Sequence, residues 1–341
     1  MRLFGLQPDE IIEIKKLFQK IFGDIDDAKV YLFGSRATGK HKKFSDIDIA
    51  ISSKSKEILS RISLLNEEWE KSKLPYKVDA TAWKDIYKPY LPQIKKEKIV
   101  LWQPDEKQLH PWRACPYGQH WVVRHPRYPI GRQIQDVDGH CRRNPSGKDI
   151  LKGDEIDFIS KVSPFLDATP HPCPYVGIVK LPNADKYDIL ITGWCKYWND
   201  ILKPDIPLNV NFVKALIYSE SKFKPDSFSK NNKKIGPARG LIQLTEQSWR
   251  ILKDKKGEIK DYYVILDKEE LFEPSKNICA GIRWLFRKRE VLQKRTKSSP
   301  NWIDVMIEYK GIRIGLKKHD PTSLRILIEF QKFYDLNSGC S

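Results

Sequence analysis

The stretch FGSRATGKHKKFSDIDIAI, residues 33–51, constrains this chain most, because it places two carboxylates one residue apart within an apolar run. In a β-strand, successive side chains point to opposite faces. Asp46 and Asp48 therefore share one face, and the three isoleucines of the run share the other. Two neighbouring carboxylates repel each other unless a cation lies between them. The pattern predicts a strand with one buried face and a metal-sized pair of carboxylates on the other.

The residues before this pair suit a phosphate group. The run VYLF reads as a strand that ends at Gly34 and Ser35. A small Gly-Ser turn lets backbone N–H groups and a hydroxyl approach a phosphate closely. Mg²⁺ prefers hard oxygen ligands and binds through one or two carboxylates together with substrate phosphates. The order of strand, turn and strand therefore predicts a site for a metal-bound phosphate.

These elements resemble the minimal nucleotidyltransferases of the DNA polymerase beta superfamily, whose signature is Gly-Ser, a similar spacer and Asp-x-Asp on the next strand. That family has a third aspartate on a later strand, and YKVDATAW offers Asp79. The resemblance covers about residues 8–103, including IKKEKIVLW. It implies Mg²⁺-dependent nucleotidyl transfer from a nucleoside triphosphate through two metal ions. The implied metal ligands are Asp46, Asp48 and Asp79, and the implied triphosphate contacts are Gly34, Ser35 and Arg36.

One departure and one alternative accompany this resemblance. Thr38 stands where many relatives carry a second basic residue, which bears on the affinity for the triphosphate. The alternative interpretation is a half-buried strand that carries two solvated aspartates.

Two further sequence patterns predict helices packed on a sheet. Their apolar positions are Ile11, Ile14, Phe18 and Ile21, and Ile58, Ile62, Leu65 and Trp69.

Length and composition predict a folded protein with two or three domains. The 341 residues are 40% hydrophobic and 11% aromatic, which argues against disorder. The longest apolar runs are far short of a membrane span. Acidic residues interrupt the N-terminal stretch MRLFGLQPDEIIEIKKLF, so it does not read as a secretory signal. We therefore expect a cytoplasmic protein without a membrane span.

The net charge of +17 is concentrated near the C-terminus. Residues 186–341 carry 30 basic and 19 acidic side chains. Such an excess predicts a polyanionic partner, which is nucleic acid, an anionic cell-wall polymer or a membrane surface. A generally lysine-rich composition is the alternative explanation.

Residues 104–185 hold eleven of the 22 prolines and five of the seven histidines, and short runs such as HWVVRH predict small strands and loops. The six cysteines of the chain form no CxxC pair, and in a cytosolic protein we expect free thiols. Thiolates and imidazoles in residues 110–173 suit a structural zinc ion, although their spacing matches no standard framework. A β-rich linker or targeting module is the preferred interpretation. The residues concerned are His110, His120, His125, His140 and His171, and Cys115, Cys141 and Cys173.

The third segment predicts helices and a candidate acid. In NVNFVKALIYSES, the residues Phe212, Ala215 and Leu216 lie on one helical stripe, and Glu220 lies at the end of that helix. The negative end of the helix dipole, together with burial, favours the protonated carboxyl, as a general acid requires. Downstream, EPSKNICAGIRWLF places Pro274 in the first turn of a further helix.

These blocks resemble the lytic transglycosylase domain of the soluble, goose-lysozyme-like type. The matching blocks are Glu-Ser in ALIYSESKFKP, Gly-Leu-x-Gln in ARGLIQLT, the helix EPSKNICAGIRWL and the Tyr-containing EYKG, within about residues 186–335. The resemblance implies that Glu220 protonates the glycosidic oxygen between N-acetylmuramic acid and N-acetylglucosamine and then deprotonates the muramyl 6-hydroxyl. The implied substrate-binding residues are Ser221, Gly240, Leu241, Gln243 and Tyr309. EYKG replaces the more usual Tyr-Asn-Gly, and Thr245 replaces a common methionine. The alternative interpretation of Glu220 is a purely structural one, in which a glutamate at a helix end pairs with a nearby lysine.

The expected fold class is a multidomain α+β protein. It comprises an α/β nucleotidyltransferase domain (1–103), a small β-rich middle module (104–185) and an all-α lysozyme-like domain (186–341). We expect a peptidoglycan-cleaving enzyme joined to a nucleotidyltransferase with a protein or nucleic-acid acceptor. Since peptidoglycan lies outside the membrane, release or non-classical export during phage or mobile-element activity would bring enzyme and wall together. The alternatives are an antitoxin-like regulatory nucleotidyltransferase whose C-terminal domain only binds wall polymer, and a nucleic-acid-binding effector with a degenerate lysozyme fold.

Overall fold

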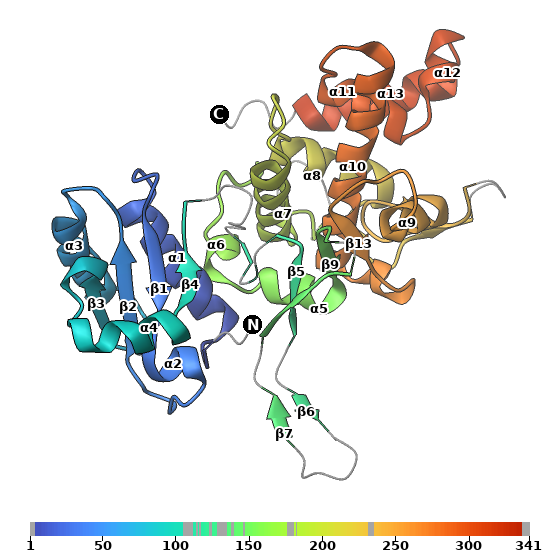
Figure 1. Cartoon of the computed structure of the whole chain (residues 1–341). Helices are drawn as coiled ribbons and strands as arrows, with labels where there is room; N and C mark the ends of the chain where they lie inside the picture. The colour runs from blue at the N-terminus through green and yellow to red at the C-terminus, as the bar shows by residue number, and fades with distance from the viewer. Residues whose placement is uncertain are drawn as a thin grey trace. The chain divides into compact units, whose positions relative to one another are not determined.

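The structure is a computed structural model. It describes residues 4–104, 112–113, 115, 117–122, 125–127, 135–137, 140–145, 147–175, 181, 183–230 and 235–335, and of residues 125–127, 135–137, 140 and 163–164 it describes the backbone alone. The chain forms two compact units, Met1–Gly147 and Lys148–Ser341 (Figure 1). Within the described ranges, no helix is both long enough and apolar enough to cross a bilayer.

The first unit is built on a four-stranded sheet with the order β3-β2-β1-β4. Strand β1 is antiparallel to both of its neighbours, whereas β2 and β3 are parallel. The strands are β1 (Lys29–Leu32), β2 (Ile47–Ser52), β3 (Val78–Ala82) and β4 (Ile99–Trp102). The helices are α1 (Pro8–Phe22), α2 (Gly34–Thr38), α3 (Ile58–Glu70) and α4 (Leu91–Glu97), with 3₁₀ turns η1 (Trp83–Asp85) and η2 (Lys88–Tyr90) between β3 and α4.

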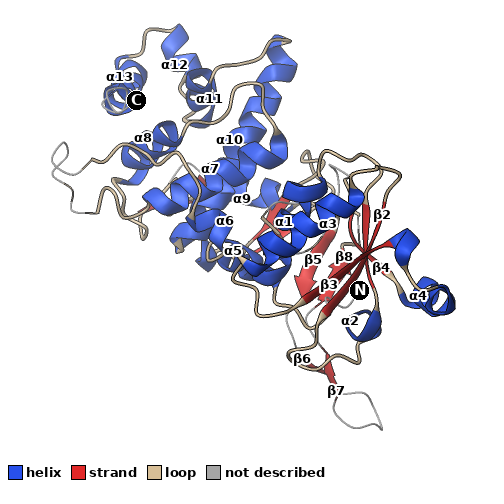
Figure 2. Ribbon diagram, turned by 90° about the vertical axis from the view of Figure 1, so that its left-hand side faces the viewer, coloured by secondary structure: helices blue, strands red, loops and turns tan. Residues whose placement is uncertain are grey.

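One face of this sheet is covered by α1 and α3, which Figure 2 shows together on the same side. The isoleucines of β2 at positions 47, 49 and 51 are buried on this face, as the alternation predicts. The apolar stripes predicted for the two helices are also confirmed, because all eight of their residues are buried. Helix α1 begins with Pro8 and with a capping box between Gln7 and Glu10, which satisfies backbone N–H groups of its first turn.

The opposite face carries the polar residues of β2 and β3 and is partly covered by α4. Ala50 of β2 packs there with Ile86 and with Ile94 of α4. Asp48 lies on the same face as Ala50, because residues two apart in a strand share a face. The smaller core therefore closes part of this face, and the carboxylates occupy the end at which β2 begins.

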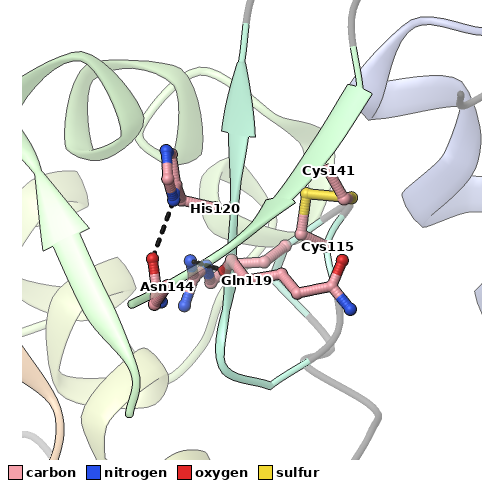
Figure 3. Close-up of a disulfide and its surroundings, with 6 residues drawn as sticks. Cys115, Gln119, His120, Cys141 and Asn144 are labelled. Carbon is pink, nitrogen blue, oxygen red and sulfur yellow. Dashed lines mark hydrogen bonds between the residues drawn. A yellow bond between two sulfur atoms is a disulfide. The ribbon is translucent and has the colours of Figure 1, made fainter. Parts of the chain in front are cut away.

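Cysteines 115 and 141 form a disulfide in the first unit, so the expectation of free thiols is wrong for this pair. Strands β5 (Gln119–Val122) and β8 (His140–Arg143) pair antiparallel, with Cys141 opposite Trp121, and Cys115 precedes β5 (Figure 3). Both cysteines pack in the core under the sheet. Sequence spacing misses this contact because the two cysteines are 26 positions apart and meet only in the folded chain. Strands β6 (His125–Arg127) and β7 (Gln135–Val137) form a further antiparallel pair.

The disulfide also removes the support for a structural zinc ion in this segment. A metal-binding thiolate is not available once its sulfur is bonded to another sulfur. His120 Nδ1 lies 2.7 Å from the side-chain oxygen of Asn144, as drawn in Figure 3. Cys173 is a buried thiol of the second unit. His110 and the side chains of His125 and His140 lie outside the described residues.

The second unit is mainly helical and includes short strands. Its helices are α5 (Gly153–Ile159), α6 (Ser163–Leu166), α7 (Asp188–Leu202), α8 (Val210–Ser221), α9 (Glu246–Lys253), α10 (Pro274–Thr296), α11 (Trp302–Tyr309), α12 (Arg313–Lys317) and α13 (Pro321–Asp335), with the 3₁₀ turn η3 (Glu269–Phe272). Its strands are β9 (Ile150–Lys152), paired with β13 (Tyr263–Ile265), and the three-stranded set β10 (Phe228–Ser229), β11 (Ala238–Arg239) and β12 (Leu244–Thr245).

Helix α10 forms the centre of the second unit. The indole of Trp198 on α7 donates a hydrogen bond to the carbonyl of Cys279, and that of Trp194 donates to the hydroxyl of Ser275. Lys214 of α8 is fully buried and contacts two carboxylates. These contacts hold α7, α8 and α10 together. The predicted fold class is therefore confirmed, with a mixed α/β first part, a small β-containing middle and a helical last part.

Candidate active sites

Asp48 and Asp79 form the floor of the first site. Asp48 of β2 is paired in parallel register with Asp79 of β3, so both side chains leave the same face of the sheet. Asp48 is half-buried, whereas Asp79 is exposed, as is Asp46, which directly precedes β2. Burial, followed by the negative charges of Asp79 and Asp46, raises the pKa of Asp48. The three predicted carboxylates therefore interact electrostatically with one another.

Gly34 contacts this floor from the turn after β1. Its φ of +73° lies in the left-handed region, and a Cβ at this position would overlap the Oδ2 atom of Asp48. Only glycine therefore fits here without displacing the carboxylate. The Gly34 N–H donates a hydrogen bond of 3.1 Å to Oε1 of Glu97 on α4. Ser35 follows in α2 with a partly exposed side chain, and the Thr38 hydroxyl donates to the carbonyl of Gly34.

Arg36 is fully buried beneath the loop that leads into β2. Its guanidinium donates to the carbonyls of Phe4, Ser45 and Asp46 and lies 4.3 Å from the centre of the Tyr76 ring. The resemblance implied a contact of Arg36 with the triphosphate. In this structure the guanidinium instead holds the backbone that presents Asp46.

The described carboxylates suit Mg²⁺ by their chemistry. Nowhere in the described ranges are three or more His, Cys, Asp or Glu side chains already arranged to hold a metal ion. Mg²⁺ needs only one or two protein carboxylates, because substrate phosphates and water complete its coordination. Asp48 and Asp79 provide such a pair, and a cation would relieve the repulsion that raises the pKa of Asp48.

The second site is a pocket of about 350 Å³ at the C-terminal end of α8. Asn209 caps the other end of this helix through its side chain, and Lys222 terminates the helix with a φ of +50°. This end places Glu220 in the wall of the pocket. The described residues that line the pocket are Ser219, Glu220, Ser229, Ile235, Ala238, Gln243, Thr245, Ser248, Trp284, Tyr309, Lys310, Ile326 and Glu329.

Glu220 forms an ion pair within this pocket. The Lys310 ammonium lies 2.7 Å from Oε1 of Glu220. The two side chains are only 8% and 17% exposed, respectively. Lys310 is the residue that replaces asparagine in the EYKG block. The pocket thus holds the predicted acid in direct contact with a cation.

Gln243 and Tyr309, two of the residues predicted to bind substrate, also line the pocket. The Gln243 side chain donates to the carbonyls of Ser227 and Gly240 and accepts from the Ser229 hydroxyl. These bonds hold its backbone at a φ of +52°, in the left-handed region. The Tyr309 hydroxyl donates to the carbonyl of Ile242, and burial, followed by the charge of Glu220, raises the pKa of Tyr309 well above its usual value.

Three other predicted residues support the pocket and do not line it. The Ser221 hydroxyl is buried and donates to the carbonyl of Ile217 one turn back in α8. Leu241 is fully buried in the core. Gly240 has a φ of +77°, and a Cβ there would overlap Asn277 and the carbonyl of Leu271. Gly240 and Leu241 shape the backbone that leads to Gln243, and Ser221 shapes the C-terminal end of α8.

The sequence interpretation missed three charged groups at the two sites. Glu97 lies within IKKEKIVLW, which marks the end of the first family match and assigns no role to its glutamate. Lys310 was visible as a departure from Tyr-Asn-Gly, and a lysine partner for Glu220 was the structural alternative, but the sequence did not identify Lys310 as that partner. Glu329 comes from α13, and only the packing of that helix brings it to the pocket wall.

Comparisons with known proteins match two separate parts of the chain to two families. Residues 13–107 match the family Polymerase beta, Nucleotidyltransferase, and residues 205–318 match the Transglycosylase SLT domain. One relative is the probable protein adenylyltransferase MntA of Haemophilus influenzae, which is 33% identical over 105 residues. The match spans 30% of this chain and 88% of that protein.

Two solved structures resemble part of the chain at low overall similarity. A toxin–antitoxin structure with AMP-PNP has 24% identity and a TM-score of 0.23, and covers 28% of this chain and 73% of that chain. A putative nucleotidyltransferase from Sulfolobus solfataricus has 22% identity and a TM-score of 0.18, and covers 28% of this chain and 85% of that chain. Scores this low add no argument to the family matches. Through its first unit the chain belongs to the polymerase beta nucleotidyltransferase family, and in its second unit it carries a transglycosylase SLT domain.

Proposed function

We propose that the second unit is a lytic transglycosylase that cleaves peptidoglycan glycan strands with Glu220 as its acid and base. The observation that carries this proposal is the convergence of Glu220, Gln243 and Tyr309 on one pocket. The excess of basic residues in 186–341 supports an anionic wall polymer as the substrate.

In the proposed reaction, the Glu220 carboxyl gives its proton to the glycosidic oxygen, and the bond from that oxygen to muramyl C1 breaks. The muramyl 6-hydroxyl then bonds to C1 and returns its proton to the Glu220 carboxylate. The products are a 1,6-anhydromuramyl end and a free N-acetylglucosamine hydroxyl, so no water is consumed. One carboxylate serves both steps, unlike the two-carboxylate glycosidases.

The test is digestion of purified peptidoglycan by wild type and Glu220→Gln, with the products identified by mass spectrometry. Anhydro-muropeptides from wild type alone support the proposal. Hydrated muropeptides would replace it with a hydrolase. If neither protein releases products, the domain is not a wall-cleaving enzyme.

Glu329 provides the sharpest control for the mechanism, because it is a second carboxylate in the same pocket wall. If Glu220 acts alone, Glu329→Gln keeps anhydro products and loses less than about tenfold in rate, whereas Glu220→Gln loses at least about 100-fold. If Glu329→Gln abolishes cleavage and wild type yields hydrated products, a two-carboxylate mechanism is correct instead.

We also propose that the first unit transfers an adenylyl group from ATP with the help of Mg²⁺. This rests on the paired Asp48 and Asp79 and on the relative named as an adenylyltransferase. Asp46, Asp48 and Asp79 would hold the metal, which when bound supplies positive charge to the reacting phosphate. Gly34 and Ser35 shape the turn next to these carboxylates, and Arg36 holds the backbone of Asp46.

The transfer is tested with ATP radiolabelled at the α-phosphate, in the presence of Mg²⁺, on the protein alone and with cell extract. Label on this chain or on a protein or nucleic-acid acceptor, absent with Asp48→Asn, supports the proposal. No label from any nucleoside triphosphate in the presence of metal would contradict it.

A second candidate function is a regulatory, antitoxin-like nucleotidyltransferase whose C-terminal unit only binds wall polymer or nucleic acid. The Glu220–Lys310 ion pair is the observation that favours it, because it satisfies the carboxylate structurally. Salt-dependent binding of polymer or DNA, without cleavage and unchanged in Glu220→Gln, would select this function.

A protein that uses ATP and cleaves peptidoglycan must meet substrates in two compartments. ATP is cytoplasmic and peptidoglycan is not, so we propose synthesis in the cytoplasm followed by release or non-classical export. Fractionation of cells before and after induced lysis tests this proposal. Wall-bound protein in intact, growing cells would contradict it.

A further inference from the structure

Lys310 is the charged partner of Glu220 in the free protein. Its ammonium is 2.7 Å from the Glu220 carboxylate, although the residues are 90 positions apart. Lys310 directly follows α11, and Glu220 lies in the last turn of α8. Because the lysine is only 8% exposed, water screens this contact weakly.

The other charged or titratable groups that face Glu220 do not replace this contact. Tyr309 of α11 lines the pocket, but its hydroxyl donates to the carbonyl of Ile242. Glu329 of α13 adds a second negative charge to the wall. The described wall residues from the β10–β12 region, α9 and α10 are uncharged: Ser229, Ile235, Ala238, Gln243, Thr245, Ser248 and Trp284. Within the described wall, positive charge comes from Lys310 alone.

An ammonium in contact with a carboxyl group has opposite effects on the two steps of the proposed reaction. Its positive charge favours the ionised carboxylate over the protonated carboxyl group. A general acid must hold its proton before the glycosidic bond breaks. The same ammonium stabilises the carboxylate once that proton has been given. A cation at this position therefore acts against proton donation and in favour of the carboxylate that follows it.

We propose that Lys310 controls the protonation of Glu220 and thereby restricts wall cleavage to lower pH than a neutral residue at this position would allow. Lys310 acts through Glu220 and is a positioning residue, not an acid or base itself. The inference rests on the proposed transglycosylase function and deepens it. It also gives a physical role to the replacement of asparagine in the EYKG block.

The experiment measures initial cleavage rates of soluble glycan fragments at low substrate concentration over a range of pH. In Lys310→Met and Lys310→Asn we expect the alkaline limb of kcat/KM to move upward by about one pH unit. Above that limb the variants then cleave about tenfold faster than wild type. Lys310→Arg keeps the cation and the wild-type profile. Arg295→Met is the matched control, because it removes a cation that pairs with Glu308 outside the pocket wall.

A second measurement does not depend on activity. The side-chain carboxyl carbon of Glu220 is followed by carbon-13 NMR as the pH is changed, with its signal assigned by its loss in Glu220→Gln. The expected result is a higher titration midpoint in Lys310→Met than in wild type, and no such rise in Arg295→Met. An unchanged midpoint, or an unchanged pH profile in an active Lys310→Met protein, overturns the inference.

The two measurements separate this inference from the proposed function. If the midpoint rises but no variant cleaves glycan at any pH, the proposed effect of Lys310 on Glu220 stands and the transglycosylase proposal fails. If wild type cleaves and the midpoint does not move, the transglycosylase proposal stands and the role of Lys310 fails. Cleavage by Lys310→Met at a pH where wild type is inactive supports both.

Discussion

Asp48 and Asp79 occupy paired positions on the parallel strands β2 and β3, so two carboxylates leave the same face of the sheet side by side. Asp48 is the more buried of the two, and its pKa is raised first by burial and then by Asp79. This arrangement disfavours the metal-free state at neutral pH. The paired carboxylates therefore lower the stability of the metal-free fold and attract a cation to this position.

Asp48→Asn is expected to stabilise the metal-free protein while it destroys nucleotidyl transfer. A carboxyl group whose pKa is higher in the folded than in the unfolded chain costs stability once the pH exceeds the folded value. The amide removes this cost at pH 7, and we expect the melting temperature without metal to rise by about 1–3 °C. Transfer of label from ATP should fall at least about 100-fold.

Asp26→Asn is the matched control, because it removes an exposed carboxylate from the same unit. It should leave transfer unchanged. If Asp48→Asn lowers the melting temperature in the absence of metal, the carboxylate has a stabilising contact and the electrostatic argument fails.

Gly34→Ala should abolish transfer, and Gly147→Ala should not. Both glycines have a positive φ, +73° and +64° respectively, so both substitutions pay the strain of the left-handed region, about 1–2 kcal/mol. A Cβ at Gly34 would also overlap the Asp48 carboxylate, whereas a Cβ at Gly147 meets no atom within 4 Å. Chemical denaturation and the ATP transfer assay check this pair. Equal activity of the two variants would show that the Gly34–Asp48 contact is not needed.

Asp188 should make the second unit less stable as the pH rises through about 6. Burial raises the pKa of Asp188 to about 6, although its contact with Lys214 lowers it. The folded state therefore holds this proton more tightly than the unfolded state, where the usual value is 3.8. The stability from this group is present below about pH 4 and is lost between about pH 4 and about pH 6.

In Asp188→Asn, the fall in melting temperature between pH 4 and about pH 7 should become shallower. Asp200→Asn is the control on the same helix, because Asp200 pairs with Lys196 at a partly exposed position. It should keep the wild-type slope. A wild-type melting temperature that rises over this range, with the same rise in both variants, would refute the assignment.

Reduction of the Cys115–Cys141 disulfide should destabilise the first unit. The bond closes a loop with a sequence separation of 26 residues, for which chain entropy predicts about 3.5 kcal/mol. The double variant Cys115→Ala/Cys141→Ala should show the same loss without reductant. Intact mass under non-reducing conditions, before and after alkylation, reports the bond directly. Two alkylated sulfurs at these positions in protein prepared without reductant would contradict it.

Several features of this protein follow from the sequence because they depend on residues close together in the chain. The alternation in β2 predicts that Ile47 and Ile49 are buried, and it places Asp48 on the other face. Helical spacing predicts the buried stripes of α1 and α3. The order of short blocks identifies both family matches and points to Glu220 at a helix end. Local backbone geometry determines each of these features, so no long-range contact is needed to derive them.

Other features depend on contacts between residues far apart in the chain, and a local sequence pattern does not identify which of these residues meet. The sequence by itself predicted the candidate carboxylates, namely Asp46, Asp48, Asp79 and Glu220. Only the tertiary structure decided that Arg36 is buried under Asp46, that Cys115 bonds to Cys141, and that Lys310 pairs with Glu220. The physical reason is that charge and burial act through space, so a lysine 90 residues away in the sequence can become the nearest neighbour of an acid once α8 and α11 have packed.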